Sequence, residues 1–171
     1  NAETVFDTSK AVAIPGYTGI SVPEGENPDN AFFVGLNPDP VFQRYVVSDA
    51  GKVSLDKSID FTNTGIGTTG RALMRASKIL SPTKGYIIDA NSMQVIVFNP
   101  TEMAITNTIS LAGLVEADLP NRWSIFPVVD GDRFVAAISY YDADWSAAAH
   151  TKVVIVDSKT DTFVSDTSRD C

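Results

Sequence analysis

The sequence predicts an all-β fold of antiparallel strands, on the basis of three observations. Runs rich in β-branched and aromatic residues, roughly 5 to 9 residues long, alternate with turns rich in Pro, Gly, Asn and Asp. One hairpin pattern recurs three times along the chain. The 171 residues, with 44% hydrophobic and 20% charged side chains, suit a single packed domain. The alternatives are a self-contained β-sandwich or irregular all-β domain and, in third place, a parallel α/β fold.

The predicted strands fall into three groups that follow one another along the chain. Three strands of each group are expected at 31–36, 41–48 and 53–61, at 85–90, 93–99 and 104–111, and at 134–140, 152–157 and 162–166. A fourth strand can precede each group, at 11–14 or 19–22, at 73–80, and at 123–129. The chain is therefore expected to contain three four-stranded antiparallel units.

The recurring hairpin sets the length of the repeat. Ser48, Asn99 and Asp157 fall at equivalent strand ends, which are 51 and 58 residues apart. Repeats of roughly 40 to 50 residues, lengthened by inserted loops, are typical of the blades of β-propellers. The sequence thus predicts a single structural unit, 1–171, with blades at roughly 11–61, 62–112 and 113–171.

Several segments of these predicted blades resemble a known family. They are 19–24 with 31–36, 86–89 with 94–101, and 139–142 with 153–157. They resemble secreted bacterial β-propellers of the YVTN or quinoprotein-like group, especially the poorly characterised surface propellers of myxobacteria and relatives, some linked to iron uptake. The resemblance implies a non-enzymatic binding or scaffolding module, such as a subunit of a surface assembly, that is secreted, periplasmic or at the cell surface. Apart from calcium, no cofactor is expected. Such propellers usually have roughly six to eight blades, whereas this chain has about three.

A partial β-propeller of three blades leaves sheet faces uncovered, because blades bury their faces against neighbours around a closed ring. We therefore expect another segment or another protein chain to complete the ring. Cys171 is the only cysteine and stands at the last position. It is expected either to form an intermolecular disulfide in an oxidising compartment or to be a frayed terminal thiol. The start at Asn1 fits a processed leader or a piece of a longer protein.

The charge of the chain disfavours two classes of partner. Lys and Arg number 13 against 21 Asp and Glu, which gives a formal net charge of −8. A negative protein repels phosphate backbones and anionic lipid head groups, so nucleic acid and membrane surfaces are not expected as partners. No apolar run approaches the roughly 18 to 20 residues that span a bilayer.

The densest aromatic cluster contains the candidate binding residues Tyr140, Tyr141 and Trp145. Aromatic side chains of this kind stack on a sugar or anchor a protein partner, and they also serve as packing between blades. Asp142 and Asp144 are two residues apart and share one side of an extended chain. They are candidate ligands for calcium, although two carboxylates are too few for its usual six to eight oxygens.

A glycine-rich segment, Gly65–Gly70, matches a dinucleotide-binding pattern. A helix could follow at 71–80, and Asp89 stands 19 residues after the last glycine. However, the preceding strand at 57–61 is polar, and a hairpin follows Asp89, whereas a parallel sheet needs a buried apolar strand and a crossover helix. We therefore expect a loop between two blades.

His150 is the only histidine, in a small-residue stretch that suggests an exposed hairpin loop. The chain contains no G-x-S-x-G elbow and no obvious partner for a catalytic triad. The sequence therefore predicts no catalytic residue and no enzyme activity. Two alternatives remain open: half of a propeller enzyme, such as a lyase or quinoprotein-like oxidoreductase, with catalytic residues on the missing blades, and a filament-forming structural protein.

Overall fold

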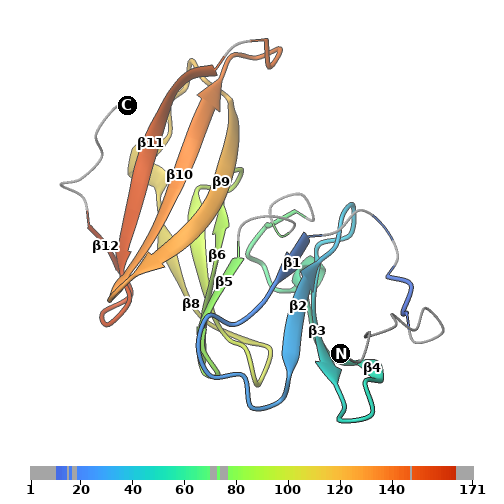
Figure 1. Cartoon of the computed structure of the whole chain (residues 1–171). Helices are drawn as coiled ribbons and strands as arrows, with labels where there is room; N and C mark the ends of the chain where they lie inside the picture. Colours follow the sequence, from blue (N-terminus) through green and yellow to red (C-terminus); the bar gives the residue numbers. More distant parts are fainter. Residues whose placement is uncertain are drawn as a thin grey trace, which may run out of the picture.

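The computed structural model describes residues 11–14, 16, 19–69, 73, 77–146 and 148–164. This part of the chain forms three four-stranded antiparallel sheets, each with its strands in sequence order (Figure 1). The first sheet contains β1 (Gly19–Ser21), β2 (Ala31–Gly35), β3 (Val41–Val47) and β4 (Val53–Asp60), the second β5 (Ser77–Ser81), β6 (Lys84–Asp89), β7 (Gln94–Asn99) and β8 (Ala104–Ser110), and the third β9 (Asn121–Asp130), β10 (Arg133–Tyr141), β11 (Ala148–Asp157) and β12 (Thr162–Phe163). Short 3-10 helices, η2 (Phe61–Asn63) and η3 (Ala112–Leu114), follow the first and second sheets.

The prediction of an all-β fold built from four-stranded antiparallel sheets is confirmed. The second sheet lies between the first and the third, and the leading strands β1, β5 and β9 are neighbours in turn, which makes the fold β-propeller-like (Figure 1). The number of blades in a complete ring, and what completes it, stay predictions.

The two larger layers of the core lie one on each face of the second sheet, and a smaller cluster of Val34, Leu36 and Tyr45 lies on the outer face of the first sheet. Phe33 and Phe42 of the first sheet pack with Phe98, and their rings lie 6.4 and 5.4 Å from that of Phe98. On the other face, the Tyr86 ring lies 5.0 Å from that of Phe134 in the third sheet. Because β6 and β7 are covered on both faces, their sequences are almost continuously apolar. The edge strands β4 and β8 are polar and mostly exposed.

The three sheets share a common register. Ala31 pairs with Val46, Tyr86 pairs with Val97, and Val135 pairs with Ile155. The second residue of each pair precedes Ser48, Asn99 or Asp157 by two positions. Ala31, Tyr86 and Val135 are therefore equivalent, and in the first two sheets this position faces the sheet that follows.

The hairpins of the second and third sheets share one design. Asp89, Asn99 and Asp157 each accept two backbone N–H bonds from the loop through Oδ1. Each loop ends on a residue with positive φ, namely Met93, Met103 and Asp161. Asn and Asp favour such turns because their side chains satisfy the loop amides. The strand ends predicted at Asn99 and Asp157 are the ends of β7 and β11.

One sequence-based expectation was wrong, and two others were narrowed. β11 begins at Ala148, so His150, expected in an exposed loop, lies in a strand. Of the two positions expected for the first strand, β1 occupies Gly19–Ser21, and 11–14 forms no strand. The strand expected at 73–80 is confirmed from Ser77 onward, where β5 begins. The described residues include no helix long and apolar enough to cross a membrane.

Candidate functional site

The predicted aromatic cluster is divided by the fold. Tyr140 is fully buried between the second and third sheets, and its hydroxyl donates a hydrogen bond to the carbonyl of Leu114 at 2.7 Å. Tyr141 points to the other face of β10, where its ring lies 5.1 Å from that of the exposed Trp145. Packing between sheets therefore accounts for Tyr140, while Tyr141 and Trp145 stay accessible for binding.

The two candidate calcium ligands are engaged in the loop that carries them. The Ser146 amide donates to Asp142 Oδ1 at 2.8 Å and to Asp144 Oδ1 at 3.1 Å. The Ser146 hydroxyl donates to Asp142 Oδ2 at 2.7 Å. Within the described ranges, no group of three or more His, Cys, Asp or Glu side chains could hold a metal ion. The geometry thus lends no support to a calcium site, which stays a prediction.

His150 belongs to a charged cluster on the third sheet. Its Nε2 lies 3.0 Å from Glu116 Oε1, and its ring stacks on that of Tyr140 at 5.0 Å. Glu116 also forms an ion pair with Lys152, whose Nζ lies 5.2 Å above the centre of the Tyr140 ring. The hydrogen bonds from Lys152 and from His150 lower the pKa of Glu116, against the effect of desolvation. The cluster fastens the loop around Glu116 to the sheet.

The glycine-rich segment lies partly outside the described residues, because Gly70 and most of 71–76 are not included. Gly65 and Gly67 have positive φ, as tight turns require. Asp89 is fully buried, and its Oδ1 accepts the amides of Asn91 and Ser92. Because these hairpin amides occupy the carboxylate, Asp89 is not available to a ribose.

The third sheet exposes an apolar face. We call this the open face and define it by Val128, Val135, Ala137, Val153 and Ile155, which pair across β9, β10 and β11. Val128 is 53% exposed and the other four are half-buried. The third sheet covers the equivalent residues of the second sheet, so they are at most 1% exposed. These equivalents of Val135, Ala137, Val153 and Ile155 are Tyr86, Ile88, Val95 and Val97, in that order.

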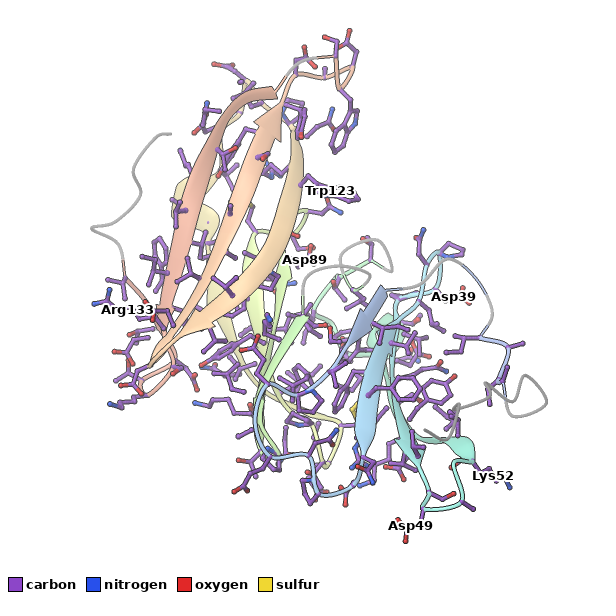
Figure 2. All side chains as sticks on the ribbon, viewed as in Figure 1. Asp39, Asp49, Lys52, Asp89, Trp123 and Arg133 are labelled. Carbon is purple, nitrogen blue, oxygen red and sulfur yellow. The ribbon has the colours of Figure 1, made fainter. Side chains whose placement is uncertain are left out.

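A basic residue stands at the rim of two equivalent faces, namely the face of the second sheet that the third sheet covers and the open face of the third sheet. Two positions before Tyr86, Lys84 reaches from the second sheet to the β11–β12 hairpin of the third. Its Nζ lies 2.8 Å from the Ser158 carbonyl and 3.0 Å from Asp161 Oδ1. The equivalent residue of the open face is Arg133, which is exposed at the end of the third sheet (Figure 2).

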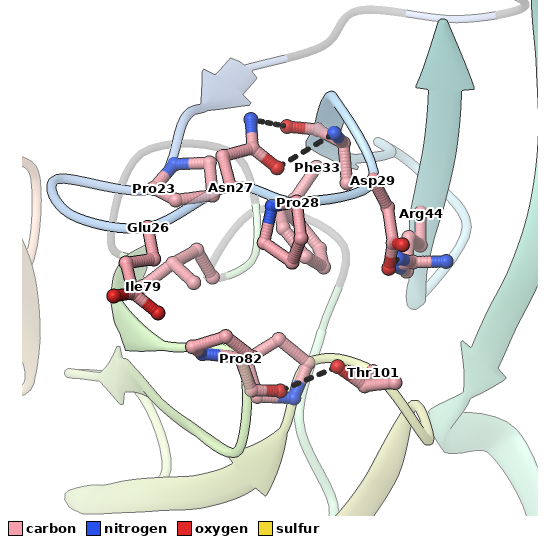
Figure 3. Close-up of a pocket in the computed structure, with 12 residues that line it drawn as sticks. Pro23, Glu26, Asn27, Pro28, Asp29, Phe33, Arg44, Ile79, Pro82 and Thr101 are labelled. Carbon is pink, nitrogen blue, oxygen red and sulfur yellow. Dashed lines mark hydrogen bonds and ion pairs between the residues drawn. The ribbon is translucent and has the colours of Figure 1, made fainter. Parts of the chain in front are cut away.

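A small pocket of about 20 Å³ lies between the first and second sheets (Figure 3). Its apolar lining includes Phe33, Ile79 and the prolines Pro23, Pro28, Pro82 and Pro100, and its polar lining includes Glu26, Asn27, Asp29, Arg44 and Thr101. The Asn27 side chain exchanges two hydrogen bonds with the Ala31 backbone, at 2.9 and 2.8 Å, and so fixes the loop that forms one wall. Proline rings restrict φ, so the walls are preformed.

Arg44 is the buried charge of this pocket. Arg44 lies on the face of the first sheet that packs against the second sheet. The equivalent position is apolar in the other two sheets, where it is Val95 in the second and Val153 in the third. Two carboxylates, those of Asp29 and Asp56, pair with its guanidinium. Asp56 is the extra residue of a β-bulge, since Arg44 pairs with Lys57 and Tyr45 with Leu55. A buried guanidinium requires such partners, because desolvation of an unpaired charge costs several kcal/mol.

Sequence reasoning missed this pocket. Arg44 stands between Gln43 and Tyr45 in a strand pattern, and nothing in the local sequence says that its side chain is buried. One feature of the sequence could have indicated the pocket. The polar run of β4 forms a bulge that brings the carboxylate of Asp56 opposite the inward-facing Arg44.

Comparisons with known proteins identify no family for this chain. No protein-family model and no curated protein matches the chain. A crystal structure of a protein from Lactobacillus plantarum is similar at 14% identity and a TM-score of 0.44, covering 86% of this chain and 54% of that one. The structure of apo AztD from Citrobacter koseri is similar at 9% identity and a TM-score of 0.42, covering 88% of this chain and 46% of that one. The chain spans about half the length of both.

Proposed function

We propose that this chain is a non-enzymatic binding module, an arc of a β-propeller-like assembly that binds a further four-stranded sheet through its open face. The carrying observation is the common register of the three sheets. In the second sheet, the positions equivalent to Val135 and Ile155 are covered by the third sheet. In the third sheet, Val135 and Ile155 themselves are only half-buried. Covering apolar surface is worth about 25 cal/mol per Å², so an apolar sheet face favours such a partner.

A second copy of the chain is a poor occupant of the open face. The matching surface would be the outer face of the first sheet, but there Val34 is 0% and Tyr45 5% exposed. Their cross-strand partners Ile20 and Leu55 are 64% and 53% exposed, so this surface does keep apolar area. The rim chemistry argues against a second copy. Neither Gly51, which shares the positive φ of Asp161, nor Lys52, which follows Ser48 by four positions as Asp161 follows Asp157, has a carboxylate to pair with Arg133. We therefore assign the open face to a sheet from another segment or chain.

The partner's chemistry follows from the junction between the second and third sheets. There the rim cation Lys84 pairs with Asp161, the last residue of the β11–β12 loop. Arg133 holds the equivalent rim position on the open face. The partner sheet therefore carries an acidic residue at the end of its third hairpin, which pairs with Arg133.

We also propose that the module works outside the cytoplasm, in secreted, periplasmic or surface-bound form, as in the propellers that it resembles. An intermolecular disulfide through Cys171 would then be chemically stable. Cys171 lies outside the described residues. Non-reducing and reducing mass measurements on protein from its natural host test this disulfide.

Photo-crosslinking tests the open face. A benzoylphenylalanine residue is placed at position 155, and in a matched control at position 115, because Val115 is 50% exposed in a loop away from the open face. In the natural host, the residue at 155 should crosslink to a segment that contains a strand–hairpin–strand with Asp or Glu at the loop end. Equal crosslinking from 155 and 115, or crosslinking of 155 to a second copy of this chain, would overturn the proposal.

Charge reversal at the rim gives an independent test. Arg133→Glu should abolish the crosslink from position 155, because its carboxylate would face the partner's acid. Lys52→Glu carries the same change of charge at the exposed hairpin of the first sheet, far from Arg133 (Figure 2). It should leave the crosslink unchanged. An unchanged crosslink in Arg133→Glu would remove the assigned role of Arg133.

A further inference from the structure

Each covered junction of this chain contains an aromatic ring from the sheet that follows. At the first junction the ring is that of Phe98, which lies 6.4 Å from the Phe33 ring and 5.4 Å from the Phe42 ring. At the second junction it is that of Phe134, which lies 5.0 Å from the Tyr86 ring. Rings at these spacings attract each other beyond the effect of the apolar area that they cover.

The two rings come from one equivalent place in the second and third sheets. Phe98 pairs with Gly85 across β6 and β7, and Phe134 pairs with Val156 across β10 and β11. By the common register these two pairs are equivalent, and we call this position the ring pair. A Cβ on Gly85 would come within 2.7 Å of the Phe98 ring, so the second sheet has room for one ring here.

The open face has smaller side chains than the equivalent face of the second sheet. Val135 stands where the second sheet has Tyr86, and Ala137 stands where it has Ile88. The other two pairs of equivalents differ by at most one methylene group. Packed sheets lie about 10 Å apart, so smaller side chains on one sheet require larger ones on its neighbour. A partner with equally small side chains would leave a cavity, which is destabilising in proportion to its volume.

We propose that the partner sheet has an aromatic residue at its own ring pair, and that this ring packs on Val135 and Ala137 of the open face. The inference rests on the proposed function and specifies the partner. At the covered junctions, the ring contacts Phe33, which is equivalent to Ala137, or Tyr86, which is equivalent to Val135. Because the open face is aliphatic at both positions, the partner supplies the ring and the missing side-chain volume.

The first sheet of this chain does not meet that requirement. Its residues at the ring pair are Asn30 and Val47, which are joined by the hydrogen bond from the Val47 amide to the Asn30 carbonyl at 3.2 Å. Neither side chain is aromatic. A second copy of the chain would therefore leave the space above Val135 and Ala137 unfilled.

The placement predicts a sequence pattern for the partner. Asp157 begins the last hairpin of the third sheet, and Asp161 ends its loop four positions later. Val156, which directly precedes Asp157, belongs to the ring pair. A partner with its ring on this strand therefore reads aromatic, Asn or Asp, three residues of any kind, and Asp or Glu. A partner with its ring on the preceding strand, as Phe134 is, has the aromatic residue directly opposite.

One substitution on the open face tests the size of the partner's side chains. Ala137→Ile gives the open face the side chain that the second sheet has at this position. A bulky partner leaves no room for it, so overpacking should lower the yield of the crosslink from position 155 at least about fivefold. With a partner of small side chains, the added contacts would keep or raise the yield, which would overturn the inference.

Ala104→Ile is the matched control, because Ala104 is exposed in the edge strand β8. It should leave the crosslink yield unchanged, and equal losses in the two variants would overturn the inference. Thermal unfolding of the isolated variants should match that of the wild type, because neither Ala104 nor Ala137 is fully buried.

Sequencing of the peptide captured from position 155 gives a measurement that needs no substitution at Ala137. The captured sheet should contain an aromatic residue at its ring pair. A captured four-stranded sheet without one would overturn this inference and leave the assignment of the open face intact. If nothing is captured specifically from position 155, both proposals are wrong.

Discussion

Lys84 Nζ lies 3.0 Å from both carboxylate oxygens of Asp161 and thereby joins the second sheet to the last hairpin of the third. The Tyr86 hydroxyl donates a further hydrogen bond to the same carboxylate. Burial, followed by this bond, raises the pKa of Tyr86 well above its ordinary value of 10.0. Asp161 thus holds two side chains of the neighbouring sheet, at a hairpin that would otherwise be an exposed tip.

Replacing Asp161 tests how much this contact stabilises the junction. Asp161→Asn keeps a residue that tolerates the positive φ of 53° at this position. It removes the charge that Lys84 and Tyr86 use, so the free energy of unfolding should fall by about 1.5–3 kcal/mol. Asp132→Asn is the control, because its pair with Lys159 is 58% and 70% exposed and should be worth at most about 1 kcal/mol. Urea unfolding measures both, and equal losses would contradict the role assigned to Asp161.

Gly35 should tolerate no side chain. A Cβ atom at this position would lie 2.0 Å from the carbonyl oxygen of Leu73, and backbone cannot yield as a flexible side chain does. Gly35→Ala should therefore lower the free energy of unfolding by about 3 kcal/mol or more, as overpacking does in a closed core. Gly113→Ala meets nothing within 4 Å and should change it by less than about 0.5 kcal/mol. A soluble, normally stable Gly35→Ala variant would show that the first sheet packs differently.

The side chain of Asn99 should be important for the β7–β8 hairpin. Its Oδ1 accepts the amides of Thr101 and Glu102, each at 3.0 Å. Asn99→Ala removes both bonds and should cost about 1–2 kcal/mol, whereas Asn99→Asp keeps an acceptor and should cost less than half as much. Thermal unfolding distinguishes the two variants. If both lose the same stability, the hairpin does not depend on this acceptor.

Glu116 should make stability depend on acid pH. Its folded pKa lies below the ordinary value of 4.5, mainly because Lys152 donates a hydrogen bond to it and His150 donates another. The stabilisation is therefore complete above the unfolded value and is lost as the pH falls through the lower folded value. Urea unfolding should show Glu116→Gln less stable than the wild type at pH 6, with the difference shrinking towards pH 3. Glu102→Gln, an exposed control, should show no such trend.

Most of the architecture could be predicted from the sequence because strand patterns and turns are local. The three hairpins were visible from the β-branched runs and from Asn99 and Asp157, whose side chains bond to amides only two and three residues away. The strand expected at 152–157 is confirmed, but its beginning was misplaced, because β11 already begins at Ala148 and includes His150. Ala148 and Ala149 are weak strand formers, and here pairing with β10 overrides that local preference.

The candidate sites could be predicted less well because they depend on contacts between distant segments. Arg44 and Asp29 come together across a hairpin, and their pocket is closed by Pro82 and Pro100 of another sheet. The burial of Tyr140 likewise depends on the second sheet, so a neighbouring pair of tyrosines in the sequence became one core residue and one surface residue. The uncovered sheet face was expected in principle, but which residues form it required the register.

The central claim is that another four-stranded sheet covers the open face in the assembled protein. Hydroxyl-radical footprinting measures this without a mutation, by comparing the oxidation of Val153 and Ile155 in the isolated chain and in cells of the natural host. Val115 serves as the internal reference in both samples. The account predicts that Val153 and Ile155 are oxidised more slowly in cells than in the isolated chain, relative to Val115, because their side chains pass from half-buried to fully covered. Equal rates in the two samples would contradict it.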